Sequence, residues 1–233
     1  LAGAKEMLRL LLTHTAVDDA ALAHLSGLTK LRDVGLHQTA VTDAGIRHLA
    51  LCKDLRTLDI GTKGVTGATL NELSGCKDLT RLSLYDRTNS DQSAVNDAGL
   101  QAVAASFPKL EELGYVQRQV TDAGLAHLSA IKLKKLTTNT SPGLEGLRHF
   151  AKISTLESLE LGRSNLTDEG LAFLAGLKFL QTLSSFDAPI TDEGLKLLQT
   201  MPALKSVTLS ETKITQAALD ALIKARPDLK VSK

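Results

Sequence analysis

Residues 41–64 read VTDAGIRHLALCKDLRTLDIGTKG, and this stretch decides the fold. Its first half is predicted to be helical, because Thr42-Asp43 in front of the apolar residues is a helix start signal. Its second half alternates apolar and polar residues through Leu58 and Ile60, which is typical of a strand. One helix and one strand of this size cannot bury their own leucines, so the unit needs neighbours.

The same unit recurs along the chain, and most copies are 24 residues long. Stacked copies would bury their leucines in one continuous column. Consecutive strands then form a parallel sheet, and the helices cover its other side. Because helices are wider than strands, we expect the stack to curve with the sheet on its concave face. The copies begin at Val17, Val41, Val65, Val95, Val120, Pro142, Leu166, Ile190 and Ile214.

Two motifs in these units, the LxxLxL strand and the [VI]-T-D-x-G-L-x-x-L segment before it, carry a resemblance to a known family. They resemble the bacterial leucine-rich-repeat proteins with TDAGLAHLAGLTKL units, which are abundant in planctomycetes. Cys52 in CKDLRTL and Cys76 in CKDLTRL also resemble the cysteine-containing repeats of F-box proteins, although the sequence has no F-box segment. The resemblance covers nearly the whole chain. It implies an α/β fold, a right-handed β-α solenoid or leucine-rich-repeat horseshoe of about nine repeats of 24 residues.

The two ends of the sequence give different expectations. Leu1-Ala2-Gly3 aligns with Leu25-Ser26-Gly27 inside the last turn of a repeat helix. We therefore expect residues 1–233 to form a single solenoid domain that is truncated at its N-terminus. At the other end we expect a last helix over residues 214–225 and a short last strand over residues 229–231.

Charge and composition disfavour several classes of partner. The net charge is +1, from 27 basic and 26 acidic residues, whereas nucleic-acid and membrane-surface proteins usually have a basic excess. No apolar run approaches the roughly 18 residues of a membrane span. The partner that we expect is another protein, with no nucleic acid and no membrane insertion, and the chain itself is expected to be monomeric in isolation.

Four histidines occupy one position of the repeat helix, and two pairs of them fall in adjacent repeats. A zinc site is therefore conceivable, but metal ligands must converge at about 2 Å from the ion. Neighbouring helices of a curved stack lie too far apart for easy convergence, so we expect structural roles and no metal. The four are His24, His48, His127 and His149.

Six aspartates form a second column at the start of the repeat helices. Stacked carboxylates could bind calcium, which takes 6–8 oxygen ligands. The simpler expectation is that each carboxylate or its threonine neighbour caps a helix and complements the helix dipole. The six are Asp19, Asp43, Asp97, Asp122, Asp168 and Asp192.

Cys52 and Cys76 lie 24 residues apart, at a position that leucine fills in other repeats. A disulfide is sterically possible, but we expect buried free thiols that act as small hydrophobic groups. Free thiols favour a reducing compartment such as the cytoplasm, although secretion stays open. The sequence has no GxxxxGK[ST], HExxH or GxSxG motif, and we predict neither catalysis nor a cofactor.

The concave face is the predicted binding surface, because the x positions of LxxLxL point away from the core. Tyr85, Val116 and Phe186 follow their strands and are expected there as large apolar groups, which are candidate hot spots. Arg81 lies on the Tyr85 strand, and Glu112 is expected beside it. Asp59 belongs to the same face. Lateral ion pairs are also expected between neighbouring strands, as between Glu111 and Lys134 and between Glu112 and Lys135.

The repeats are irregular only between about residues 83 and 141, where units of 30, 25 and 22 residues follow each other. Six extra residues fall within the polar segment DRTNSDQSA, residues 86–94, which contains Asp86 and Arg87. Insertions in solenoids map to loops that often lie on the binding face. The sequence thus predicts partner binding through the concave sheet and this loop. A small-ligand or glycan receptor and a structural spacer are the alternatives; the wide separation of Tyr85 and Phe186 disfavours an aromatic platform for a glycan.

Overall fold

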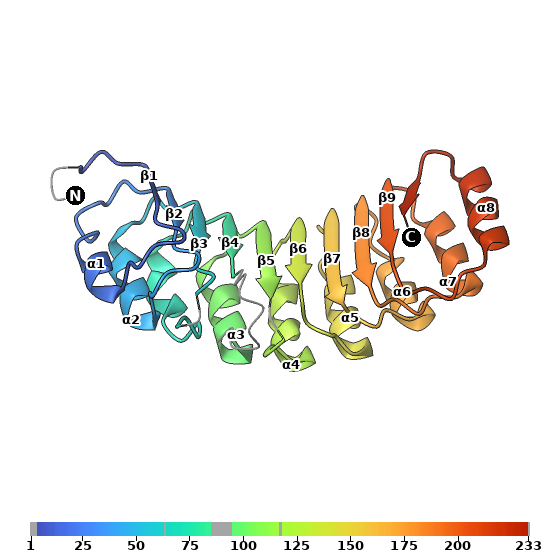
Figure 1. Cartoon of the computed structure of the whole chain (residues 1–233), viewed down its shortest axis with the longest axis horizontal. Coiled ribbons are helices and arrows are strands. Elements are labelled where there is room, and N and C mark those ends of the chain that lie inside the picture. Colours follow the sequence, from blue (N-terminus) through green and yellow to red (C-terminus); the bar gives the residue numbers. More distant parts are fainter. Residues whose placement is uncertain (1–3, 63, 85–94, 117, 233) are drawn as a thin grey trace.

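The computed structural model describes residues 4–62, 64–84, 95–116 and 118–232. Their strands form one parallel sheet of ten strands in chain order, so each repeat adds one strand beside the previous one. In Figure 1 the strands line the inner side of a shallow arc and the helices line its outer side. The strands are β1 (Arg9–Leu11), β2 (Asp33–Gly35), β3 (Thr57–Asp59), β4 (Arg81–Ser83), β5 (Glu112–Val116), β6 (Lys135–Thr138), β7 (Ser158–Arg163), β8 (Thr182–Phe186), β9 (Ser206–Leu209) and β10 (Lys230–Ser232).

The helical layer consists of short α-helices, some of which continue as 3₁₀ turns. The predicted helix starts are confirmed, since α2, α4, α6 and α7 each begin directly after a capping threonine. The α-helices are α1 (Asp19–Ala23), α2 (Asp43–Ile46), α3 (Asp97–Ser106), α4 (Asp122–Ala126), α5 (Leu144–Ala151), α6 (Asp168–Leu174), α7 (Asp192–Leu197) and α8 (Gln216–Ala225). The 3₁₀ turns are η1 (Arg47–Leu51), η2 (Leu70–Gly75), η3 (His127–Ala130) and η4 (Leu198–Thr200).

The unit that begins at Val65 differs from the expectation, because its described residues form the 3₁₀ turn η2 and no α-helix. Where the neighbouring units have Thr42-Asp43 and Asn96-Asp97, this unit has Thr66-Gly67. Gly67 adopts a left-handed backbone with φ of 85°. A left-handed residue cannot begin a right-handed helix, so the missing aspartate explains the missing helix.

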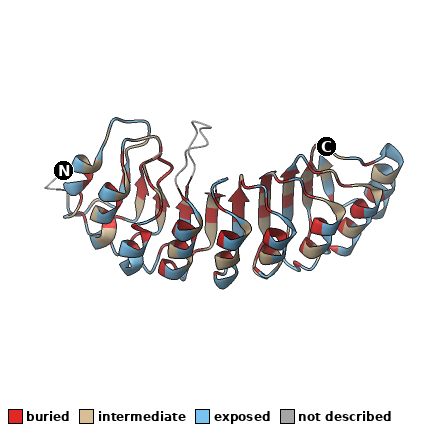
Figure 2. Cartoon of the chain, turned by 90° about the horizontal axis from the view of Figure 1, so that it is seen from below, coloured by how far each residue is buried: buried red, intermediate tan, exposed pale blue. Residues whose placement is uncertain are grey.

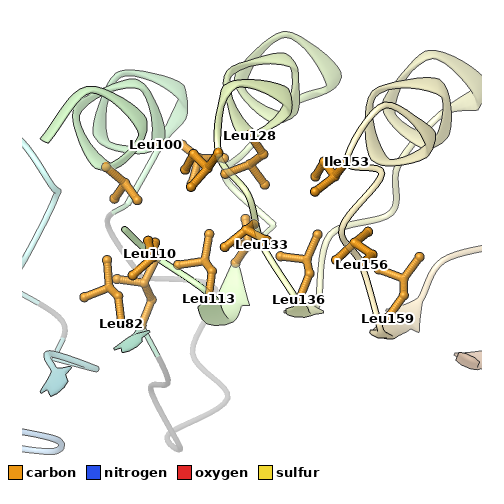
Figure 3. Close-up of a cluster of buried hydrophobic side chains, with 14 of the residues drawn as sticks. Leu82, Leu100, Leu110, Leu113, Leu128, Leu133, Leu136, Ile153, Leu156 and Leu159 are labelled. Carbon is orange, nitrogen blue, oxygen red and sulfur yellow. The ribbon is translucent and has the colours of Figure 1, made fainter. Parts of the chain in front are cut away.

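The core is the predicted column of apolar side chains. Leu82, Leu113, Leu136 and Leu159 are paired in register along four neighbouring strands, and all are at most 1% exposed. Figure 3 shows them below the apolar side chains that the helical layer contributes, among them Leu128. Figure 2 shows buried residues on the strands and on the helix sides that face them, with exposed residues on the outer helix sides. Each repeat therefore buries its leucines only against its neighbours.

The aspartate column has a role that the capping expectation missed. Thr42 caps α2 as expected, since its hydroxyl accepts the Ala44 N–H. The carboxylate of Asp19, however, belongs to the previous repeat and accepts the N–H and O–H of Thr42 at 2.8 and 2.6 Å. Each aspartate thus fastens its own repeat to the backbone at the start of the next helical segment. The same link joins Asp43 to Thr66, Asp97 to Thr121, Asp168 to Thr191 and Asp192 to Thr215, and Asp122 receives the Gly143 N–H.

We expect Asp19→Asn to destabilise the fold at neutral pH, and the deficit to shrink in acid. Burial acts to raise the pKa of Asp19, but hydrogen bonds from Thr42 and Gly45 outweigh it and hold the pKa below its ordinary value of 3.8. Such a carboxylate stabilises the fold above 3.8 and loses this contribution as pH falls through the lower folded value. Urea unfolding of both proteins at about pH 7 and about pH 3 measures the change. A deficit of equal size at both pH values would contradict the role of the charged form.

The two cysteines are free and fully buried, as predicted. The Cys52 thiol donates to the Leu28 carbonyl and the Cys76 thiol to the Cys52 carbonyl, each at 3.4 Å. Burial raises the pKa of each thiol to about 11. Both side chains therefore fill the core as neutral, weakly hydrogen-bonded groups.

Candidate binding face

Two rows of side chains run across the concave face of the sheet, because alternate strand residues point away from the core. We call them the first row and the second row; in each, residues of adjacent strands lie side by side. The first row is Arg9, Asp33, Thr57, Arg81, Glu112, Lys135, Ser158, Thr182, Ser206 and Lys230. The second row is Leu11, Gly35, Asp59, Ser83, Gly114, Thr137, Glu160, Ser184, Thr208 and Ser232.

Charges in the first row pair with each other. Arg9 contacts Asp33 at 3.2 Å, and Arg81 makes a two-pronged contact with Glu112 at 2.7 and 2.8 Å. The hydrogen bond from Arg81 lowers the pKa of Glu112, and the same bond raises the pKa of Arg81. Arg81 and Glu112 are side by side as predicted, but each is already occupied by the other. Such half-exposed pairs fix side-chain positions and contribute little to stability.

The other predicted lateral pairs have mixed outcomes. Lys134 contacts Glu111 at 2.9 Å, which confirms the first of them. Glu112 binds Arg81 on β4 instead of Lys135 on β6, and Lys135 acts on it only as a more distant charge. Lys135 is exposed, and Glu112 does not pair with its charge on the concave face.

Asp59 is the charged residue in the N-terminal half of the second row. Among the ion pairs of the described residues, none includes Asp59. Its carboxylate accepts the Gly61 N–H at 3.3 Å. Burial raises the pKa of Asp59, and the nearby His37 and the hydrogen bonds from Gly61 and Ser83 only partly offset this effect. A half-buried carboxylate whose burial is only partly offset by its neighbours is stabilised further when a cation binds to it.

Val116 does not lie on the solvated face, which corrects the prediction for this residue. Its side chain is 0% exposed and belongs to the core. The cause is a β-bulge in β5, where Gly114 and Tyr115 together oppose Thr137 and the pairing resumes with Val116 beside Thr138. One extra residue reverses the side-chain alternation, so Val116 turns inward.

Tyr115 is the residue that the bulge adds to the face. It is half-buried and has φ of 60°, a left-handed backbone inside a strand. A tyrosine rarely adopts this conformation, since its Cβ crowds the backbone there. In the sequence, only the irregular repeat length points to it, because a bulge changes spacing by one residue without a motif of its own.

The remaining predicted residues lie in different places. Tyr85, Asp86, Arg87 and the rest of the 86–94 segment lie outside the described residues. Phe186 is 43% exposed at the end of β8, on the concave side as predicted. It is three strands away from Glu112 on β5, so the structure does not gather the predicted residues at one point. Leu11, which the sequence did not single out, is 61% exposed on β1 of the same face.

The described residues contain no group of three or more His, Cys, Asp or Glu side chains placed to hold a metal ion. His48, His127 and His149 are half-buried and His24 is exposed, each on or beside its helical turn. Within the same residues, no helix is long and apolar enough to cross a membrane.

Known proteins share this architecture. A family model described as Leucine Rich repeat matches residues 152–175. Internalin C2 from Listeria monocytogenes has a TM-score of 0.66 and 21% identity, and the match covers 87% of this chain and 80% of that chain. A leucine-rich-repeat protein of Leptospira interrogans has a TM-score of 0.63 and 14% identity, over 100% of this chain and 62% of that chain. Among proteins of curated function, none matches the sequence.

Proposed function

The chain is a leucine-rich-repeat protein, and from this premise we propose that it is a non-catalytic module that binds another protein through its concave face. Leucine-rich-repeat proteins generally mediate protein–protein interaction, and their curved stacks offer an extended concave surface. The observation that carries the proposal is the pair of large apolar side chains on this solvated face. Leu11 is 61% exposed and Phe186 is 43% exposed.

These two side chains frame a face that is otherwise small or polar. Most of the second row between them consists of glycine, serine and threonine, which leave room for a partner's side chains. Binding energy at protein interfaces concentrates in a few large groups surrounded by near-neutral contacts. Phe186 fits the description of such a group, because it is a large apolar side chain that lies at the end of β8 and is exposed to solvent.

A matched pair of phenylalanine variants tests the proposal. Phe179 is 62% exposed but lies in the turn between α6 and β8, away from the concave face. The whole chain serves as bait in extracts of the source organism, and the recovery of each bound protein is quantified by mass spectrometry. We expect Phe186→Ala to weaken partner capture by roughly 30-fold, the loss of one hot spot of about 2 kcal/mol, and Phe179→Ala to leave capture unchanged.

The comparison separates the two faces. Equal capture by wild type and Phe186→Ala, or loss only with Phe179→Ala, would refute binding at the C-terminal half of the concave face. Both side chains are exposed, so neither substitution should change the free energy of urea unfolding by more than about 0.5 kcal/mol.

A further inference from the structure

We propose that the partner contributes an extended segment with two basic side chains, one bound at Asp59 and one at Glu160, whose backbone crosses the sheet at Gly114. The inference rests on the proposed function and adds the chemistry of the partner. It concerns the second row from β3 to β7, which lies between Leu11 and Phe186.

Charge complementarity is the first argument. The second row contains two carboxylates, Asp59 and Glu160, and no basic residue. Of the first-row cations near these carboxylates, Arg81 is engaged by Glu112, whereas Lys135 on β6 is exposed and is not bound by Glu112. Glu160 accepts only a long hydrogen bond of 3.4 Å from Thr137 in the described contacts. Both carboxylates therefore retain acceptor capacity that a guanidinium or ammonium group would use.

The spacing of the two carboxylates favours an extended segment. Asp59 on β3 and Glu160 on β7 are four strand intervals apart in the sheet. At about 4.8 Å per interval the distance is roughly 19 Å, which an extended chain spans with about six residues at 3.3 Å each. Residues i and i+6 of such a chain point to the same side, so both basic side chains can face the sheet. A helix would need about 13 residues for the same distance.

Gly114 is the second argument, because it lies midway between the two carboxylates and the fold does not require a glycine there. A Cβ atom at this position would meet its nearest neighbours, in Ser83 and Leu82, at 3.8–3.9 Å, an ordinary contact distance. Its φ is not in the left-handed region. A glycine inside a strand weakens the strand and often marks a place where another backbone approaches closely. The bulge at Gly114 and Tyr115 adds to this, because bulges frequently accompany binding sites.

Lys135 limits which basic chains fit. It is exposed in the first row, on the strand between Gly114 and Glu160. A densely basic segment would meet this like charge, whereas two basic residues separated by small neutral ones would not. The two carboxylates of the second row also repel a phosphate backbone, so the row fits a protein segment and not a nucleic acid.

Synthetic peptides test the proposal on the whole chain. Fluorescein-labelled ten-residue peptides of serine and alanine carry two arginines either six or five positions apart, so composition and charge are identical. Fluorescence anisotropy at low salt measures their affinities. We expect the six-residue spacing to bind about fivefold more tightly than the five-residue spacing, since only the former directs both arginines to the sheet. A peptide with two glutamates six positions apart should not bind.

Variants of the chain connect this binding to the named residues. We expect Asp59→Asn with Glu160→Gln to weaken the six-spaced peptide about tenfold. Gly114→Val should block the backbone approach and weaken it by a similar factor, and Gly114→Ala, whose Cβ the fold accommodates, should cause a smaller loss. Glu169→Gln is the control, because it removes one exposed charge from α6 on the helical side. It should leave the affinity unchanged.

The outcomes distinguish this inference from the proposed function. Equal affinity for the two arginine spacings, or an unchanged affinity of the double variant, would overturn the basic-segment proposal. If those results came together with loss of partner capture by Phe186→Ala, the concave face would bind a protein of different chemistry. Tighter binding of the glutamate peptide would likewise overturn the assignment of charge.

Discussion

Gly124→Ala is expected to destabilise the fold by about 3 kcal/mol, through overpacking and the loss of hydrogen bonds to a carboxylate. A Cβ atom at this glycine would lie 2.2 Å from Asp97 Oδ1 and 2.9 Å from Val120 Cγ1. The Asp97 carboxylate cannot withdraw freely, because it accepts the N–H and O–H of Thr121 at 2.7 and 2.6 Å. An added methyl group must break this link between two repeats. The glycine of the T-D-x-G motif is thus required by the aspartate of the previous repeat.

Urea unfolding of single and double variants measures this coupling. Gly27→Ala is the control, because a Cβ atom there meets nothing within 4 Å, and its stability should be unchanged or slightly higher. Removing the obstructing carboxylate in Gly124→Ala with Asp97→Ala should make the two changes less than additive by about 1 kcal/mol or more. Strict additivity, or a Gly124→Ala midpoint equal to that of Gly27→Ala, would rule out the proposed contact.

Arg226→Ala is expected to cost about 3 kcal/mol, because it removes guanidinium hydrogen bonds to three carbonyl groups, and the Leu204 carbonyl has no other donor among the described residues. The side chain of Arg226 is only 14% exposed. Its guanidinium donates to the carbonyls of Leu198, Met201 and Leu204, where the previous repeat turns from helix to strand. It also binds Asp228 through two nitrogens, and this hydrogen bonding raises the pKa of Arg226. One side chain therefore joins the last two repeats.

Arg226→Lys should recover little of the lost stability. The planar fork of a guanidinium can reach three carbonyls and a carboxylate at once, and an ammonium group cannot. Arg148→Ala provides a comparison: Arg148 lies 4.4 Å from the centre of the Phe173 ring but is 51% exposed. Its loss should cost about 1 kcal/mol or less. Thermal unfolding ranks the three variants, and hydrogen exchange of β9 and β10 locates the effect. An Arg226→Ala protein as stable as Arg148→Ala would show that the carbonyls find other donors.

The sequence predicts well the features that recur from one repeat unit to the next. The alternation around Leu58 and the threonines before α2, α4, α6 and α7 are local signals, and the structure confirms the strands and caps that they predict. The burial of Cys52 and Cys76 also follows from the repeat, because a position filled by leucine in one unit faces the core in every unit. The lateral contact of Arg81 with Glu112 is confirmed for the same reason. In a stack, equal repeat positions become neighbours.

The candidate site shows where this reasoning fails. Val116 was expected on the concave face because the alternation was extended through Gly114 and Tyr115 without interruption. The bulge inserts one residue there, and a shift of one residue moves every following side chain to the opposite face. Asp59 was predicted on the correct face, but its lack of an ion pair within the described part of the chain depends on which residues the neighbouring strands place beside it.

The sequence by itself determined the repeat, its helix-then-strand order, its capped helix starts and, where the strand alternation is uninterrupted, the row that each side chain joins, since these depend on spacing along the chain. Tertiary structure alone decided how one repeat meets the next. Three contacts between repeats show this: the hydrogen bond from Thr42 to Asp19, the space at Gly124 that the Asp97 carboxylate occupies, and the bulge at Tyr115 in the pairing of β5 with β6. Such contacts depend on distances of tenths of an ångström between units, which periodicity does not encode.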